Sequence, residues 1–112
     1  MRSSLALRVS GVRLTLFTRA NCGLCNVAKA RIDEFQKKCP RPINYSEIDI
    51  MDSAQQKWRD VYEFDVPVLH VDRVADGTNT HPTLEAAKKL MHRFTVEEVE
   101  RAAAEVEQTS SS

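Results

Sequence analysis

The chain carries no net charge, because its 16 lysines and arginines equal its 16 aspartates and glutamates. With no excess of either sign, no overall field attracts nucleic acid or an anionic membrane, and we expect neither as a partner. The longest apolar runs are the size of strands, far below the roughly 20 residues that a membrane-spanning helix needs. We therefore expect a soluble protein with one domain, since 112 residues leave no room for a second core.

Cysteine is scarce as well. Three cysteines, two of them in one Cys-x-x-Cys pair, do not form the disulfide framework of a small secreted protein, which favours a reducing compartment. No apolar stretch is long enough for a secretory signal. Residues 1–12 carry two arginines, three serines and no acid, the bias of a mitochondrial presequence. Because strand residues begin almost at once, we expect instead an N-terminal extension, residues 1–12, on a cytoplasmic protein, with a mitochondrial location as the alternative.

A strand pattern and a helical pattern meet at Cys22-Gly23-Leu24-Cys25. Apolar and polar residues alternate from Val12 to Thr18, and apolar residues then recur at helical spacing from Cys25 toward Lys38. Residues at i and i+3 of a helix are neighbours, with roughly 5–6 Å between their Cβ atoms, so modest adjustment brings two sulfurs to disulfide geometry. The sequence therefore predicts a dithiol that can close and reopen.

The two cysteines should differ in role, because only one of them precedes the helix. The unpaired N–H groups and positive dipole end of the first turn stabilise a thiolate on Cys22, which makes it the attacking group. Cys25 lies inside the first turn and should be shielded. A structural zinc site is the main alternative, but it needs four ligands. Cys39 stands about 20 Å away at the far end of the helix, where we expect a buried or half-buried small apolar side chain rather than a third redox centre.

After this helix, which Pro40 and Pro42 end, the pattern indicates a strand from Ile43 to Ile50. Its alternation changes phase around Ser46 and Glu47, which indicates a bulge or an edge position. A short helix should follow, capped by Asp52 with Gln55 in the reciprocal position, and its apolar face should comprise Ala54, Trp58, Val61 and Tyr62.

The second half of the chain predicts two further strands and a helix. The first strand runs from Val66 to Val71, is opened by Pro67 and places His70 in the core. Residues 73–82 are expected to form a loop, residues 83–89 either a helical turn or more loop, and residues 90–94 a short strand. Thr95 and Glu98 form a capping box for a last helix that presents Val96, Val99, Ala103 and Val106.

These elements give the order β-α-β-α-β-β-α. A β-α-β unit requires a parallel crossover and the short last link favours an antiparallel pair, so we expect an α/β fold with a mixed sheet and helices on both faces. The domain should span residues 13–107, with a disordered tail at 108–112. The cysteines then lie beyond the carboxyl end of the first strand, where open α/β sheets place their sites.

The run from Phe17 to Cys25, together with Val66-Pro67 before a late strand, resembles the glutaredoxin branch of the thioredoxin fold. The run from Tyr62 to Val71, after Ile48-Asp49-Ile50, looks like a subfamily of small, mostly uncharacterised glutaredoxin-like proteins. The resemblance covers residues 12–106 in element order. It implies a thioredoxin-like fold and a role in electron transfer and cell redox homeostasis.

Carried over residue by residue, the resemblance implies that Cys22 is the nucleophile and Cys25 the resolving cysteine. Arg19 takes the place of the family's lysine, a cation near the thiolate and near the carboxylate of bound glutathione. Pro67 matches the proline whose preceding bond is cis in the family and which presents the backbone of Val66 to a thiol peptide. An X-Pro bond taken at random would be cis in only about 5–6% of cases.

The chain departs from the family at two places that bear on glutathione. Typical glutaredoxins have Pro-Tyr where this chain has Gly23-Leu24. They also have Gly-Gly before an acidic helix start, which receives the γ-glutamyl end of glutathione. The corresponding run here is His92-Arg93-Phe94-Thr95, whose side chains either fill that space or, through Arg93, contact a carboxylate.

The sequence thus favours a thiol-disulfide oxidoreductase with no resident cofactor, and with glutathione or a protein disulfide as its partner. We expect it to act as a monomer. Two alternatives stay open: a thioredoxin-fold module that binds a protein without turnover, and a carrier of zinc or of an iron–sulfur cluster bridged between two chains. Trp58 and Tyr62 are interpreted as packing residues rather than as a binding platform.

Overall fold

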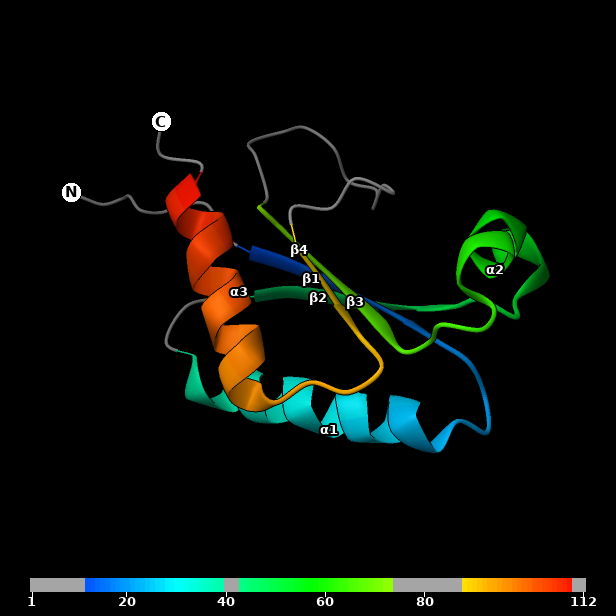
Figure 1. Ribbon diagram of the computed structural model, residues 1–112, viewed down its shortest axis with the longest axis horizontal. Coiled ribbons are helices and arrows are strands. Elements are labelled where there is room, and N and C mark those ends of the chain that lie inside the picture. The colour runs from blue at the N-terminus through cyan, green and yellow to red at the C-terminus, as the bar shows by residue number, and fades with distance from the viewer. Residues whose placement is uncertain (1–11, 40–42, 74–87, 110–112) are drawn as a thin grey trace.

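The computed structural model describes residues 12–39, 43–73 and 88–109 (Figure 1). The elements follow in the order β1 (Val12–Thr18), α1 (Gly23–Lys38), β2 (Ile43–Asp49), the 3₁₀ turn η2 (Ser53–Gln55), α2 (Gln56–Tyr62), β3 (Val68–Arg73), β4 (Lys88–Met91) and α3 (Val96–Thr109). The strands lie side by side as β2-β1-β3-β4. Strand β1 is parallel to β2 and antiparallel to β3, and β3 is antiparallel to β4, which confirms the expected element order and mixed sheet.

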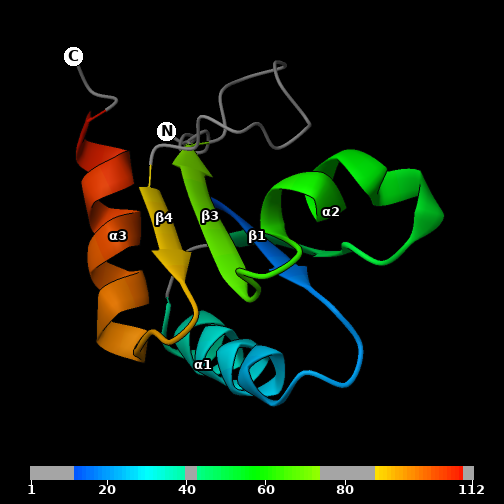
Figure 2. The ribbon, with the colours of Figure 1, turned by 45° about the vertical axis from the view of Figure 1, so that its right-hand side comes forward.

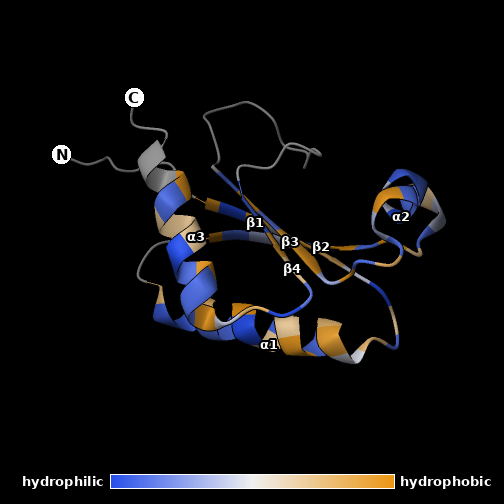
Figure 3. Ribbon diagram, viewed as in Figure 1, coloured by the Kyte–Doolittle hydropathy of each residue, from blue (hydrophilic) through white to orange (hydrophobic). Residues whose placement is uncertain are grey.

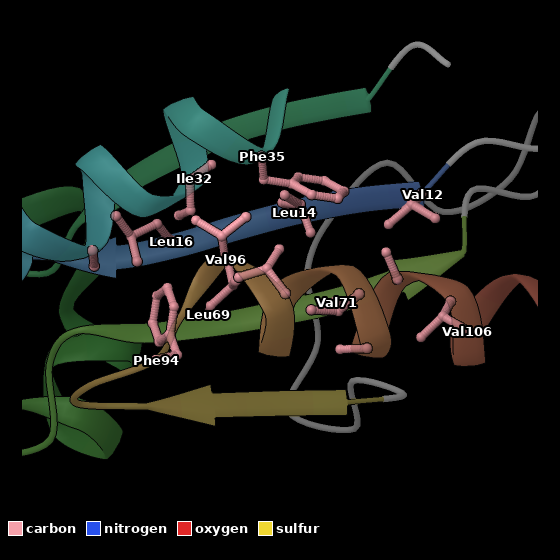
Figure 4. Packing of buried hydrophobic residues seen from close by; sticks show 14 residues of the cluster. Val12, Leu14, Leu16, Ile32, Phe35, Leu69, Val71, Phe94, Val96 and Val106 are labelled. Atoms are coloured by element: carbon pink, nitrogen blue, oxygen red, sulfur yellow. The ribbon is translucent and has the colours of Figure 1, made fainter. Parts of the chain in front are cut away.

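Strand β1 is buried at all seven positions, and its side chains serve two cores. Val12, Leu14 and Leu16 pack with β3, α1 and α3 in the larger core (Figure 4). Phe17 packs in a smaller core on the α2 side, together with Ile50, Trp58, Tyr62 and Val68. Figures 1 and 2 show α1 and α3 close together and α2 apart from them. The sheet therefore has a helix layer on each face, as expected.

The phase change within β2 follows from these two cores. Ile43 and Tyr45 pack against the larger core, whereas Ile48 packs against the smaller one, so the apolar positions switch faces along the strand. All seven residues pair with β1 in continuous register, from Val12–Ile43 to Thr18–Asp49. Of the two predicted alternatives, the edge position is confirmed, because β2 is the outermost strand of the sheet. The other alternative, a bulge, is absent from this strand.

Several predicted boundaries were wrong by a few residues. Val12 begins β1, as the alternating pattern predicted, but α3 continues to Thr109, into the residues assigned to the tail. Strand β3 begins after Pro67 rather than at Val66, and β4 starts two residues earlier than predicted, at Lys88. The predictions for residues 1–11, 74–87 and 110–112 lie outside the described residues. None of the helices within the described part of the chain is long and apolar enough to cross a membrane.

The predicted face of α2 was right for its aromatic residues and wrong for the others. Trp58 and Tyr62 are buried, but Ala54 and Val61 are exposed. Asp52 caps the 3₁₀ turn, where its Oδ1 accepts a hydrogen bond from the backbone N–H of Ala54 at 3.0 Å. The 3₁₀ turn rotates the chain before α2 begins, so Ala54 does not share the buried stripe. Figure 3 shows the resulting mixture of apolar and polar segments along the helices.

His70 is fully buried in the aromatic core, as predicted. Its ring lies 4.6 Å from the ring of Phe17, and its Nε2 shares a hydrogen bond with the Tyr62 hydroxyl at 2.7 Å. Burial lowers the pKa of His70 to about 4, helped by the charge of Lys89 and of Arg13 and opposed by that of Asp72. The folded protein therefore holds this histidine in its neutral form.

This burial predicts a loss of stability in mild acid. The pKa of His70 is about 4 in the folded chain and 6.5 in its ordinary state, so the unfolded chain gains the proton first as the pH falls. The free energy of unfolding is unaffected by this histidine above about pH 6.5. It falls as the pH drops from about 6.5 to about 4, by about 3 kcal/mol in all. Urea unfolding across this range measures it. His70→Gln should flatten the pH dependence by about one proton, and an unchanged slope would contradict the assignment.

Candidate functional site

Cys22 is the N-cap of α1. Its backbone is extended, and its Sγ accepts a hydrogen bond from the backbone N–H of Cys25 at 3.2 Å. Asn21, just before it, has a φ of 58°, in the left-handed region that asparagine adopts more readily than most residues. The first turn of α1 contains no acidic residue. The half-buried sulfur of Cys22 thus lies at the positive end of the helix, with no nearby carboxylate in that turn to oppose a thiolate.

Cys25 lies behind Cys22 and is only 1% exposed. Burial raises the pKa of the Cys25 thiol, and so do its contact with the Cys22 sulfur and the negative charge that Cys22 can carry. The Thr18 hydroxyl and the backbone N–H of Arg19 act in the opposite direction. All three cysteines are unpaired in this structure. The arrangement is a reduced dithiol with one accessible sulfur and one shielded sulfur that keeps its proton more tightly.

The turn before β3 lies against the loop that carries Cys22. The Val66–Pro67 bond is cis, as the resemblance implied. Arg19, three residues before Cys22, donates a hydrogen bond from its guanidinium to the backbone carbonyl of Glu63 at 3.3 Å. Arg19 therefore links the cysteine loop to the turn that leads into the cis proline.

A third segment, between β4 and α3, reaches the same turn. The backbone N–H of His92 donates to the carbonyl of Pro67 at 2.7 Å, and its Nε2 lies 3.8 Å from Oδ1 of Asp65. The φ of His92 is 64°, a conformation that glycine adopts without cost. The segment thus keeps a glycine-like backbone although it carries a histidine.

A pocket of about 290 Å³ opens between α1 and this segment. Its lining residues are Leu24, Val27, Ala28, Arg31, His92, Arg93, Phe94, Thr95 and Glu98. Leu24, from between the two cysteines, joins the pocket to the dithiol. Arg31 faces Glu34 at 3.4 Å, whereas Arg93 is exposed and makes no hydrogen bond or ion pair within the described residues. The pocket therefore has an apolar floor and, at its rim, a cation that has no partner among the residues that the structure describes.

The N-terminus of α3 beside this pocket is already satisfied. The backbone N–H of Thr95 donates to Oε1 of Glu98 at 2.8 Å, and the N–H of Glu98 donates to Oγ1 of Thr95 at 3.1 Å. This is the predicted capping box. Because a carboxylate of the chain occupies the helix start, an anionic ligand in the pocket would depend on Arg93 more than on the helix dipole.

The predicted site residues fall into two groups around Leu24. Cys22, Cys25 and Arg19 lie on the β1–α1 junction beside Val66 and Pro67, whereas Leu24, Arg93 and Thr95 line the pocket. Sequence reasoning did not assign four residues to the site, because their patterns indicated only a strand, a helix or a cap. Thr18 affects the Cys25 thiol, and the pocket lining includes Val27, Arg31 and Glu98. The strand period could have indicated Thr18, since it is the last residue before the cysteine loop. A Cβ on Gly23 would meet no atom within 4 Å, so no clash explains the missing family proline.

Two other predictions concern metal and Cys39. Within residues 12–39, 43–73 and 88–109, no group of three or more histidine, cysteine or acidic side chains could hold a metal ion. Cys39 is half-buried and packs against the larger core, as predicted.

This chain matches a known protein family and is similar to several solved structures. The family model of the glutaredoxin-like domain (DUF836) matches residues 13–103. Among solved structures, desulfothioredoxin from Desulfovibrio vulgaris Hildenborough in its reduced form is similar, with 20% identity, a TM-score of 0.60, and coverage of 86% of this chain and 82% of that chain. Thioredoxin 1 from Thermosipho africanus has 17% identity, a TM-score of 0.59, and coverage of 89% and 99%.

A structural genomics target protein from X. campestris is similar over 79% of this chain and 91% of its own, with 20% identity and a TM-score of 0.51. Likeness at these identities shows the fold, and the fold is the α/β thioredoxin-like fold that the sequence predicted.

The position of Arg19 predicts an effect on the reactivity of Cys22. A nearby cation favours a thiolate, so Arg19→Gln, which keeps a donor for the Glu63 carbonyl but removes the charge, should slow alkylation of Cys22 by iodoacetamide at pH 7. We expect about a fivefold effect, the size of a screened surface charge. Arg19→Lys should restore the rate. Equal alkylation rates in all three proteins would show that Arg19 does not affect the reactivity of Cys22. Its role would then be the hydrogen bond to the Glu63 carbonyl.

Proposed function

The chain belongs to the glutaredoxin-like domain family of the thioredoxin fold, and on that premise we propose that it is a thiol-disulfide oxidoreductase. The observation that carries the proposal is the pairing of Cys22 and Cys25. The first sulfur caps α1 and is accessible, and the second is buried directly behind it. A structural role alone does not require an accessible sulfur at the positive end of a helix.

In the proposed reaction the Cys22 thiolate attacks one sulfur of a substrate disulfide. A Cys22–substrate disulfide forms, and the other substrate sulfur leaves as a thiolate and takes a proton. Cys25 then gives up its proton and attacks the Cys22 sulfur, which releases the second substrate thiol and leaves a Cys22–Cys25 disulfide. The chain loses two electrons and the substrate gains them. Two thiol equivalents, from glutathione or from a dithiol protein, restore the reduced state.

The raised pKa of Cys25 suits its place in this sequence. While Cys22 carries the negative charge, its contact with Cys25 keeps the Cys25 proton in place, so the two sulfurs are not charged together. Once Cys22 is in a mixed disulfide that charge is gone, and the Thr18 hydroxyl and the Arg19 N–H then favour ionisation of Cys25. In the proposed reaction the accessible Cys22 attacks first, and the buried Cys25 attacks second.

Glutathione is our proposed source of reducing equivalents, and the pocket beside Leu24 supports this choice. An exposed cation at the rim suits a carboxylate, and an apolar floor suits the body of a small peptide. Because Glu98 occupies the start of α3, we assign the carboxylate contact to Arg93 rather than to the helix N-terminus.

The first test separates the roles of the two thiols. Cys22→Ser should abolish disulfide reduction, because the buried Cys25 cannot reach a substrate. Cys25→Ser should still form a mixed disulfide and hold it, since no resolving thiol remains. Mass spectrometry after treatment with oxidised glutathione measures both. An adduct on Cys25 in the Cys22→Ser protein, with none on Cys22 in its counterpart, would reverse the assignment. No adduct on either, and no turnover in the unmodified protein, would favour the non-catalytic binding module.

A second test addresses glutathione itself. Arg93→Gln should lower the glutathione-dependent rate about fivefold, the effect of losing one exposed charge-assisted contact. His92→Gly, which suits the backbone at that position, removes the neighbouring side chain from the pocket lining and tests whether the histidine takes part as well. Steady-state kinetics with a small neutral disulfide measures both. A faster rate in either variant would show that these side chains block the tripeptide instead.

A further inference from the structure

One aromatic ring of this chain, on the turn between α2 and β3, lies almost wholly in solvent. Phe64 is 90% exposed, whereas the aromatic residues of the smaller core are each at most 4% exposed. It is the most exposed large apolar residue among the described residues. A ring in this setting has a cost in water that no contact within the described chain offsets.

The exposure of Phe64 does not come from a loose turn, because both of its neighbours are held. The backbone N–H of Glu63 donates to the carbonyl of Arg59 at 2.9 Å, and the N–H of Asp65 donates to the carbonyl of Tyr62 at 2.9 Å. The carbonyl of Glu63 accepts from Arg19 at 3.3 Å. The backbone that carries the ring is thus held in place, so a partner that covers the ring does not have to order the turn as well.

The same bonds bring the turn that carries Phe64 to the end of the sheet where the Cys22 loop lies. Arg19 connects the Phe64 turn to the loop that holds Cys22, and the turn runs directly into Val66 and Pro67. Figure 2 shows the connection from α2 to β3 and the connection from β1 to α1 at the same end of the sheet. A molecule joined to Cys22 and large enough to extend across this turn would meet Phe64.

We propose that Phe64 is a docking anchor for a protein whose disulfide Cys22 reduces, an inference that rests on the proposed function. The occupant is a polypeptide with apolar side chains beside its disulfide. A small disulfide reaches Cys22 and the pocket on the Leu24 side without extending to the ring. The acidic residues on either side of the ring already have partners in the chain, because Glu63 lies 3.7 Å from Arg59 and Asp65 lies 3.8 Å from His92. The charges around the ring are thus largely balanced, which favours neither an anionic membrane nor a highly charged partner and suits an apolar side chain of a polypeptide. Exposed rigid aromatic residues are the usual energetic centres of such contacts.

The test compares a protein disulfide with a small one in single-turnover reactions. The pre-reduced chain is mixed with insulin or with bis(2-hydroxyethyl) disulfide, and no other reductant is added. Each turnover oxidises one Cys22–Cys25 dithiol and reduces one substrate disulfide to two thiols, so loss of the dithiol, read by alkylation and mass spectrometry, reports the rate. The variants are Phe64→Ser, Phe64→Leu as the conservative change, and Val61→Ser, an exposed apolar residue on the preceding turn, as the matched control.

We expect Phe64→Ser to react about tenfold more slowly with insulin and at an unchanged rate with the small disulfide. Phe64→Leu should retain most of the insulin rate, and Val61→Ser should match the unmodified chain with both substrates. Equal insulin rates in the Phe64→Ser and unmodified proteins would overturn the inference. So would an equal loss in Val61→Ser, which would point to a general disturbance of α2.

The outcomes also separate this inference from the proposed function. Reduction of the small disulfide without any reduction of insulin would reject the docking role and leave the oxidoreductase proposal intact. No reduction of either substrate would reject the oxidoreductase proposal. An unchanged insulin rate together with a Phe64-dependent dimer, or with Phe64-dependent binding to phosphatidylglycerol vesicles, would assign the ring to a second copy or to a membrane.

Discussion

The candidate site depends on one hydrogen bond, from the backbone N–H of Cys25 to the sulfur of Cys22. Helix N-caps are usually oxygen atoms, which accept well from N–H groups, whereas a neutral thiol accepts weakly. The cap therefore becomes strong when the sulfur is ionised. The position of the Cys22 sulfur and the start of the helix thus depend on the same bond. A disulfide to Cys25 would remove that charge, so oxidation of the pair and the stability of the first turn are coupled.

The sheet brings the other parts of the site to this sulfur. Because β1 lies between β2 and β3, its carboxyl end is flanked by the ends of both neighbours, and β3 runs in the opposite direction. The start of β3, with the cis proline before it, is therefore adjacent to the end of β1. Phe17 turns to the opposite face from Leu16 and anchors α2 through Trp58 and Tyr62, which fixes the turn that follows α2. Both cores thus contribute to the site, one through α1 and the other through this turn.

Much of this arrangement could be predicted from short-range patterns. The bounds of β1, the two cysteines at the start of α1, and the capping box of Thr95 and Glu98 each depend on residues within a few positions of one another. Predictions failed where a distant partner decides the structure. For the phase change in β2, the predicted edge position was confirmed and the alternative of a bulge was not, because the sequence does not show that Ile43 and Ile48 serve different cores. The exposure of Val61 and Phe64 likewise depends on what packs against α2, which periodicity does not reveal.

The departures from typical glutaredoxins change the chemistry around the dithiol more than the backbone. His92 adopts a φ of 64°, the conformation that glycine would supply, at a cost of about 1 kcal/mol for a residue with a Cβ. Its N–H makes the bond to the carbonyl of Pro67 that this geometry permits, so the turn before β3 is still held from the α3 side. What differs is the wall of the pocket, where Arg93 supplies an exposed cation and the Glu98 carboxylate occupies the helix start. Under the proposed function, the backbone would position a disulfide substrate, and the choice of substrate would be left to side chains on either flank of Cys22.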